Sequence, residues 1–214
     1  MDKKWLLIGA VVAAIAWGGT ALYQSLRTGT PRGTGDERQQ VASSPSTTSP
    51  TTMKFTSSAF AQNQSMPPAY TCDGDNVSPS LTISDVPADL EARVKSFALI
   101  VDDPDAASGT WVHWVIWNID PNVRTIESGS VPIGVAGITA WSVSLAVQGT
   151  TSFGATNWGG PCPPSGTHRY FFKLYALDTV LNLPTTTNKD GLLDAINSHI
   201  LAQTELIGLY QRAK

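Results

Sequence analysis

The sequence predicts an all-β or β-dominated α+β sandwich that ends in a C-terminal helix. Short β-type runs recur along the chain, and Pro, Gly, Asn and Asp separate them. One run, residues 97–101, is apolar at every position, which is typical of a strand buried on both faces. A single segment near the C-terminus has the apolar spacing of an amphipathic helix.

The composition favours one folded domain with a substantial core. The chain has 214 residues, of which 42% are hydrophobic and 14% charged, and its net charge is −3. This length holds one domain and is too short for two full-sized ones beside an N-terminal extension. No Lys- or Arg-rich run is present, so the electrostatic signature of a nucleic-acid-binding protein is missing. We therefore do not expect nucleic acid as a partner.

Residues 1–27 predict a single-span membrane anchor. Residues 5–23 carry no charge, and as a helix they would span about 28 Å, close to the roughly 30 Å hydrocarbon core. Lys3 and Lys4 favour a cytoplasmic N-terminus. A cleaved signal peptide is the first alternative and a buried soluble helix the second. The membrane anchor and the cleaved signal peptide would both place the domain outside the cytoplasm, in the periplasm or at the cell surface. Cleavage would make it a secreted protein.

A polar segment separates this anchor from the folded domain. Residues 28–52 are rich in Ser, Thr, Pro and Gly and nearly free of apolar side chains, so burial cannot offset their ordering entropy. We predict a disordered linker over residues 28–52 and a folded domain over residues 53–214. The β-type runs of this domain are residues 55–60, 81–83, 96–101, 110–119 and 169–177.

The predicted C-terminal helix covers residues 189–210, with a break expected at Gly208. Its apolar residues follow a spacing of i, i+1, i+4 and i+8 and would share one helix face: Leu192, Leu193, Ile196 and Ile200. His199 would belong to this helix and lie at its surface or boundary.

The two cysteines fit an exported domain. Cys72 and Cys162 are the only cysteines, and an isolated pair in an oxidising compartment is a plausible disulfide. Such a bond would close a long loop, which chain-entropy models value at about 4.5 kcal/mol. The alternative is two small buried thiols.

Two carboxylates emerge at the end of the apolar run. The sequence Asp103-Pro104-Asp105 follows that run directly, and Pro104 ends strand pairing. One carboxylate could hold a histidine in a single tautomer or accept a hydrogen bond from a ligand ammonium group. The alternative is a local Asx-type turn in which both aspartates bond to nearby backbone N–H groups.

His113 lies within a β-type run rich in tryptophan. Strict alternation places it on one face with Trp111, Val115 and Trp117. As a candidate ligand-binding residue it competes with a second interpretation, a core histidine bonded to a backbone carbonyl.

Residues 159–164 form a glycine- and proline-rich loop that can be neither a helix nor a central strand. Glycines let backbone N–H groups approach a ligand, and neighbouring prolines stiffen the loop. The alternative is a purely structural Ω-type turn. In the following run His168 and Tyr170 share one face, where Tyr170 could donate to a phosphate oxygen, whereas Arg169 would point the opposite way.

The motifs of common enzymes are missing. The chain has no Gly-x-Ser-x-Gly elbow, no His-Glu-x-x-His and no Walker loop. No motif positions a nucleophile, so we expect a binding protein, with a hydrolase as the weaker alternative because one Asp and two His resemble acid–base equipment. Zinc held by the three histidines is a weak alternative, because His199 is expected on a different, helical element.

These motifs together make the chain similar to the phosphatidylethanolamine-binding protein family, and more narrowly to its bacterial Raf-kinase-inhibitor-like branch. The likeness covers residues 53–212. Beyond the motifs described above, it is carried by residues 69–79 and 170–178. It implies a central antiparallel β-sheet, a second smaller sheet, flanking helices and a shallow anion site at one end of the central sheet. Phosphate- or carboxylate-type anions, including phospholipid headgroups, are the implied ligands, and no cofactor is expected.

The resemblance assigns the ligand-binding roles residue by residue. The predicted ligand-binding residues are Asp103, Asp105, His113, Gly159, Gly160, Pro161, Cys162, Pro163, His168 and Tyr170. The sequence departs from the family pattern in three places: Thr151 precedes Ser152-Phe153-Gly154 where Asn is usual, Trp158 replaces a tyrosine, and residues 137–147 are longer than the family norm. This insertion and the pocket rim suggest a second hypothesis, a protein-interaction module that inhibits a protease or a signalling enzyme.

Overall fold

The computed structural model describes residues 52–132, 134–135 and 145–213 of the chain. The predicted anchor, residues 1–27, lies outside the described residues, as do the linker up to residue 51 and most of the 137–147 insertion. Within the described ranges no helix is both long enough and apolar enough to cross a membrane.

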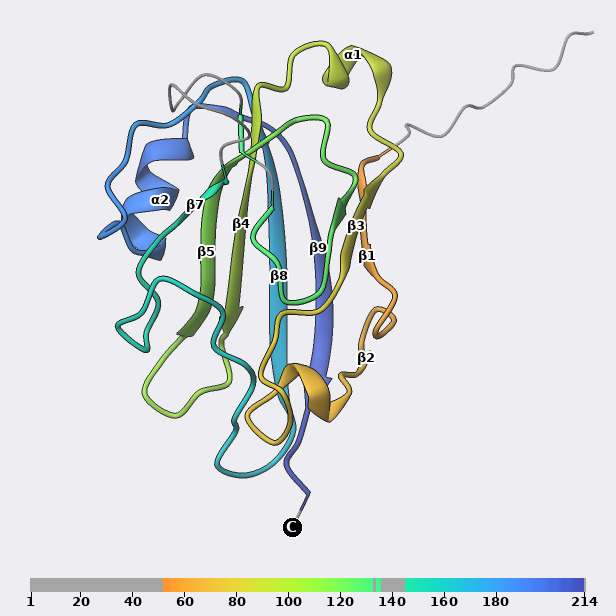
Figure 1. Cartoon of the computed structure of the whole chain (residues 1–214), viewed down its shortest axis with the longest axis vertical. Helices are drawn as coiled ribbons and strands as arrows, with labels where there is room; N and C mark the ends of the chain where they lie inside the picture. The colour runs from red at the N-terminus through yellow and green to blue at the C-terminus, as the bar shows by residue number, and fades with distance from the viewer. Residues whose placement is uncertain (1–51, 133, 136–144, 214) are drawn as a thin grey trace, which may run out of the picture. The chain divides into compact units, whose positions relative to one another are not determined.

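A six-stranded sheet forms the centre of the domain (Figure 1). Its strand order is β2-β9-β8-β4-β5-β7, with β2 parallel to β9 and every other pair antiparallel. The strands are β2 (Gln64–Ser65), β4 (Ser96–Asp103), β5 (Trp111–Ile119), β7 (Val147–Gln148), β8 (His168–Leu177) and β9 (Ile200–Tyr210).

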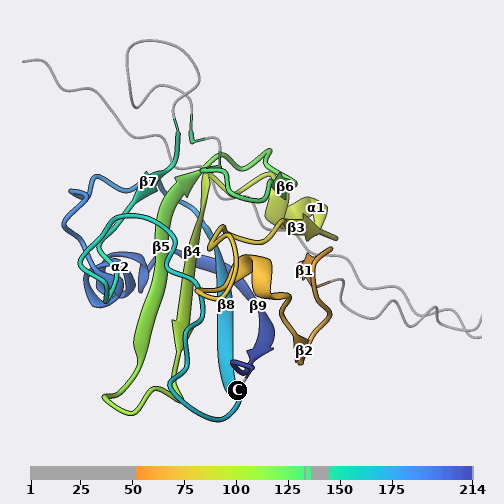
Figure 2. The ribbon, with the colours of Figure 1, turned by 60° about the horizontal axis from the view of Figure 1, so that its bottom comes forward.

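A smaller sheet and short helices complete the fold. The second sheet is antiparallel in the order β1-β3-β6, formed by β1 (Lys54–Ser57), β3 (Leu81–Ser84) and β6 (Thr125–Ile126). The helices are the 3₁₀ turn η1 (Pro68–Tyr70), α1 (Ala88–Glu91) and α2 (Lys189–Ile196). Figure 2 shows α2 and the smaller sheet on opposite sides of the central sheet.

Alternating residues of β4 separate two cores. Phe97, Leu99 and Val101 pack with residues of the smaller sheet, whereas Ala98 and Ile100 pack with the apolar face of α2. All eight residues of β4 are buried, as predicted for a strand covered on both faces. The same alternation sends the side chains of two successive aspartates at the end of β4 to opposite sides.

Asp102 is fully buried on the α2 side of the sheet. Its carboxylate pairs with Lys173 of β8 at 2.8 Å and with Lys189, the first residue of α2, at 2.5 Å. These ion pairs fasten α2 to the sheet.

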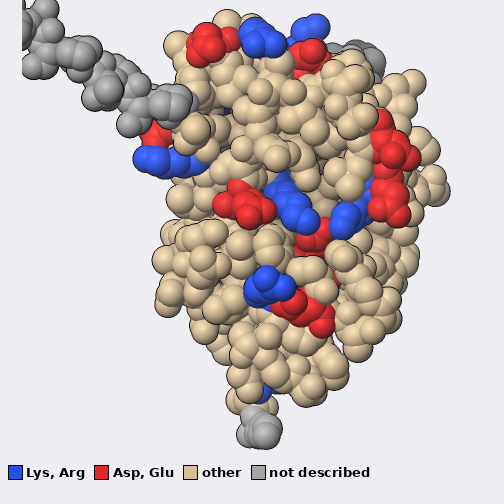
Figure 3. Space-filling view, turned by 180° about the vertical axis from the view of Figure 1, so that it is seen from behind, with Lys and Arg blue, Asp and Glu red and all other residues tan. Residues whose placement is uncertain are grey.

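Figure 3 shows basic and acidic side chains lying beside one another on the rear face rather than in separate patches of one sign.

The predicted C-terminal helix is correct only in its first half. Helix α2 ends at Ile196, and residues 200–210, predicted as helix, form strand β9 instead. This strand pairs with β8 along its whole length, and its buried residues recur with a period of two at Leu206, Gly208 and Tyr210. His199 lies in the turn between α2 and β9, where its Nδ1 bonds to the Asp178 carboxylate at 2.8 Å.

A β-bulge in β5 corrects the predicted side-chain alternation. Val101 pairs with Trp114, but the next residue, Asp102, pairs with Val112, so His113 is the extra residue of β5. The bulge rotates His113 away from the face of Val115, which packs against α2. His113 instead lies on the opposite face of the sheet, as do Trp111 and the residues that pack toward the smaller sheet. Its predicted shared face with Val115 and Trp117 is therefore wrong.

Candidate functional site

A cavity of about 310 Å³ lies at one end of the central sheet, where β4 ends and β5 and β8 begin. This is the lower end of the sheet in Figure 1. The residues that line it are Asp103, Ala106, Ala107, Ser108, Trp111, His113, Phe153, Cys162, Pro163, Pro164, His168 and Tyr170. The structure thus brings six of the ten predicted ligand-binding residues together around one space.

Asp103 and His168 form a buried pair in the wall of this cavity. The Oδ2 atom of Asp103 lies 2.7 Å from Nδ1 of His168, and the two residues are only 4% and 9% exposed. The other oxygen, Oδ1, accepts a hydrogen bond from the Asp105 N–H at 2.8 Å. Both interpretations of the Asp-Pro-Asp sequence therefore apply to one carboxylate, which closes the turn and orients a histidine.

His113 is held by the glycine loop. Its Nδ1 lies 2.5 Å from the carbonyl oxygen of Gly159, and the Gly159 N–H donates to the His113 carbonyl oxygen at 3.0 Å. Because a carbonyl oxygen can only accept, the shared proton belongs to Nδ1 of His113. The side chain is 97% buried (3% exposed), and this burial lowers the pKa of His113 below its ordinary value, partly opposed by the bond to Gly159.

Aromatic rings pack against the imidazole of His113. Tyr170 lies edge-on to His113, with ring centroids 5.1 Å apart, and burial followed by the Asp103 charge raises the pKa of its phenol. Its hydroxyl therefore stays protonated at neutral pH and can donate. Phe153 is 48% exposed at the cavity rim and contacts both His113 and Trp111 edge-on.

The two glycines of the loop serve the protein rather than the cavity. The Gly159 N–H is bonded to His113, and the Gly160 N–H donates to Oδ1 of Asn76 at 2.8 Å. A Cβ at Gly160 would lie 2.4 Å from that same oxygen and 2.7 Å from the carbonyl oxygen of Tyr70. Gly159, Gly160 and Pro161 do not line the cavity, so the predicted N–H contacts from the glycines to a ligand are not supported by this arrangement.

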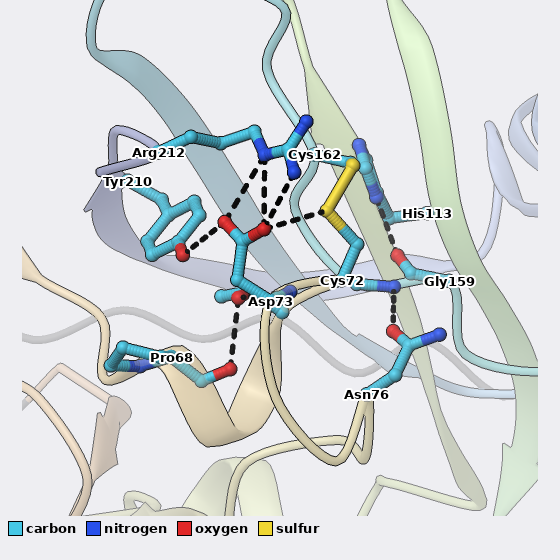
Figure 4. The surroundings of a disulfide bond; sticks show 11 residues. Pro68, Cys72, Asp73, Asn76, His113, Gly159, Cys162, Tyr210 and Arg212 are labelled. Atoms are coloured by element: carbon cyan, nitrogen blue, oxygen red, sulfur yellow. Dashed lines mark hydrogen bonds and ion pairs between the residues drawn. A yellow bond between two sulfur atoms is a disulfide. The ribbon is translucent and has the colours of Figure 1, made fainter. Parts of the chain in front are cut away.

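The predicted disulfide is confirmed. Cys72 and Cys162 are bonded, with Cα atoms 5.4 Å apart, and both residues are exposed rather than buried thiols. Figure 4 shows the bond beside the Gly159 loop and His113. A further link joins Cys72 N–H to the Pro161 carbonyl oxygen at 3.1 Å. The residues 159–164 are thus fastened to the loop after η1 at several points.

Asp105 lies outside the cavity lining. Its carboxylate makes a two-point ion pair with the Arg169 guanidinium, at 2.7 and 2.9 Å, and the hydrogen bond to Arg169 lowers the pKa of Asp105 to about 2. Arg169 points away from His168, as its position on β8 predicted. This arrangement leaves Asp103 as the carboxylate that faces the cavity.

The sequence interpretation missed several lining residues. The sequence argument names Trp111 only as part of a motif and Phe153 only as part of a departure from the family pattern, although aromatic residues beside polar motifs are the available signal. The short segment 106–108 and Pro164 gave no comparable signal. Among the residues that the structure describes, no group of three or more His, Cys, Asp or Glu side chains is placed to hold a metal ion.

The two-sheet fold with a small polar and aromatic cavity at its strand ends is that of a binding domain. The family model described as "Phosphatidylethanolamine-binding protein" matches residues 56–211, and the chain belongs to this family. A UPF0098 protein of Methanothermobacter thermautotrophicus is 45% identical over 165 residues, covering 75% of this chain and 99% of that protein. The UPF0098 protein PH1269 of Pyrococcus horikoshii is 42% identical, covering 73% of this chain and 75% of its own.

Solved structures agree with this assignment. The crystal structure of CT736 from Chlamydia trachomatis, a putative phosphatidylethanolamine-binding protein homologue by its description, aligns with a TM-score of 0.66 and 37% identity, over 76% of this chain and 99% of that one. Escherichia coli YbcL, described as a member of the mammalian PEBP family, aligns with a TM-score of 0.64 and 30% identity, over 75% and 99% of the two chains.

Proposed function

We propose that this chain is a binding protein for a small phosphate- or carboxylate-type anion, such as a phospholipid headgroup, and that it is not an enzyme. The observation that carries the proposal is the convergence of His113 and His168 on one solvent-accessible cavity, each with its Nδ1 fixed by the protein. This leaves one Nε2 on each ring for a ligand. An imidazolium at His168 would be balanced by Asp103, and Tyr170 adds a hydroxyl donor.

We also propose that residues 1–27 tether the domain to a membrane, with the cavity outside the cytoplasm. The uncharged segment 5–23 and the disulfide of Cys72 and Cys162 support this location. Full-length chain should remain in the membrane fraction after a carbonate wash, and its disulfide should be oxidised in the cell. Recovery of the intact chain in the cytoplasmic fraction with two free thiols would contradict this location.

Calorimetric titration of the full-length chain in a maltoside detergent tests the anion site. Methyl phosphate should bind with saturable heat, and both His113→Ala and His168→Ala should lose most of the affinity. His199→Ala is the matched control, because this histidine lies in the turn before β9 and outside the cavity lining. Binding that is absent in the parent, or unchanged in both cavity variants, would refute the proposal.

A second function is favoured by the exposed rim. Phe153 is 48% exposed beside the cavity, where it could contact a protein partner such as a protease or a signalling enzyme. In this case Phe153→Ser would weaken inhibition of the partner while leaving methyl phosphate affinity within about twofold of the parent. The 137–147 insertion, the other predicted contact surface, lies mostly outside the described residues.

A further inference from the structure

The geometry around His113 points to a narrower ligand class: phosphate monoesters, such as a free phosphorylated headgroup, in preference to sulfate esters and to phosphodiesters, the form in which most headgroups are linked in intact phospholipids. This inference rests on the proposed anion-binding function and adds the protonation state in which the ligand is taken. It depends on one ring nitrogen of a cavity-lining residue, Nε2 of His113, and on what that atom can offer to a ligand.

Nε2 of His113 is a hydrogen-bond acceptor. The Gly159 carbonyl oxygen holds the ring proton on Nδ1, so a neutral ring carries a lone pair on Nε2. Burial favours this neutral form because it disfavours the charged one. Figure 4 shows the second ring nitrogen turned away from Gly159. A ligand that covers this nitrogen must therefore present a donor to it, because the rest of the His113 side chain is already enclosed by the protein.

The titratable neighbours of His113 do not supply that donor. Asp103 is bonded to His168, and Tyr170 faces His113 ring-to-ring, edge-on, rather than through a hydrogen bond. No lysine or arginine lines the cavity in the described part of the chain, and the nearby Arg169 is paired with Asp105. The cavity therefore combines one fixed acceptor, Nε2 of His113, with the hydroxyl donor of Tyr170 and, in the imidazolium form that the Asp103 carboxylate would balance, with Nε2–H of His168.

A phosphate monoester matches this combination. Its second pKa is about 6, so near that pH its monoanion carries one P–O–H donor beside unprotonated oxygens. The P–O–H would donate to Nε2 of His113, and the unprotonated oxygens would accept from Tyr170 and from the imidazolium form of His168 that the Asp103 carboxylate would balance. Methyl sulfate and dimethyl phosphate have the same charge but no such proton, so each would leave Nε2 of His113 facing an oxygen lone pair. An unsatisfied buried acceptor reduces affinity by about tenfold or more.

Calorimetry at pH 5.5 with three ligands of equal charge tests this inference. The full-length chain in maltoside detergent should bind methyl phosphate at least about tenfold more tightly than methyl sulfate or dimethyl phosphate. In His113→Phe, which keeps a ring but removes the acceptor, this preference should shrink to less than about threefold. His199→Phe is the matched control and should keep the parental preference.

The outcomes separate this inference from the function on which it rests. Equal affinity for the three ligands, all lost in His168→Ala, would leave the anion site standing and overturn the monoester preference. Absence of binding by any ligand to the parent would overturn both. The ligand comparison in the parent decides the matter even where His113→Phe fails to fold.

The ring tautomer gives a second measurement. In the ¹⁵N–¹H spectrum of the imidazole rings, His113 should carry its proton on Nδ1 and keep Nε2 free of a covalent proton, both before and after saturation with methyl phosphate. A His113 that becomes doubly protonated on saturation would act as a donor, and this result would overturn the inference.

Discussion

Removal of the disulfide between Cys72 and Cys162 should lower the free energy of unfolding by about 2–4.5 kcal/mol. The sequence separation of the two cysteines is 90 residues. For a loop of this length the chain-entropy relation gives about 4.5 kcal/mol at 25 °C, and measured losses for native disulfides begin near 2 kcal/mol. Because both cysteines are exposed, serine replacements remove little buried apolar area, and the loss should reflect the constraint on the unfolded chain.

Urea unfolding followed by tryptophan fluorescence measures this loss, since Trp114 and Trp117 are buried and their environment changes on unfolding. Three samples are compared at one pH: the parent chain, the parent with reductant, and the double variant Cys72→Ser/Cys162→Ser. The reduced parent and the double variant should agree within about 0.5 kcal/mol. Both should lie at least about 2 kcal/mol below the oxidised parent.

A difference of less than about 1 kcal/mol between the oxidised parent and the double variant would refute this reasoning. It would mean that the hydrogen bonds around the glycine loop hold the two loops together without help from the covalent bond. Disagreement between the reduced parent and the double variant would instead assign the effect to the serine side chains.

Three further predictions concern stability. Gly160→Ala should destabilise the domain by about 1–3 kcal/mol, because the new Cβ would lie 2.4 Å from a neighbouring amide oxygen, whereas Gly191→Ala within α2, where the nearest atom to the new Cβ is a side-chain methyl at 3.2 Å, should cost less in the same urea assay. Asp102→Ala should lower the free energy of unfolding by about 3 kcal/mol or more, because it leaves two lysines without their buried partner. Asp105→Ala, at an exposed ion pair, should lower it by less than about 1 kcal/mol. Equal losses in the two variants would contradict this reasoning. Burial lowers the pKa of His113, so below about pH 6.5 the unfolded chain binds a proton at this ring more readily than the folded chain does. The free energy of unfolding should therefore fall on acidification. The difference in this free energy between pH 7.5 and pH 5.5 should be smaller in His113→Phe than in the parent.

Much of the fold follows from local patterns. The five β-type runs correspond to β1, β3, β4, β5 and β8, because strand propensity and turn residues are both local signals. The prediction of a helix over residues 200–210 fails for a physical reason. Ile200 has the helical spacing relative to Leu192 and Ile196, although it is the first residue of β9. Only pairing with β8 reveals that the chain changes conformation after Ile196.

The site was predictable in its residue types but not in their partners. Asp103, His113, His168 and Tyr170 were recognisable from motifs, and the structure places all four around one cavity. The bulge that turns His113 toward Tyr170 could not be inferred, because the alternation in β5 has no local irregularity. The Gly160 N–H donates to Asn76, which lies 84 positions away in sequence, so this hydrogen bond cannot be inferred from the loop alone.

A residue-resolved NMR titration of the full-length chain with methyl phosphate tests the central claim most directly. An anion site at the end of the central sheet predicts saturable shifts that share one affinity at Asp103, His113, His168 and Tyr170. The turn at His199 should stay unchanged across the same titration. Shifts that do not saturate, or that centre on residues away from the cavity, would contradict the assignment of this cavity as the anion site.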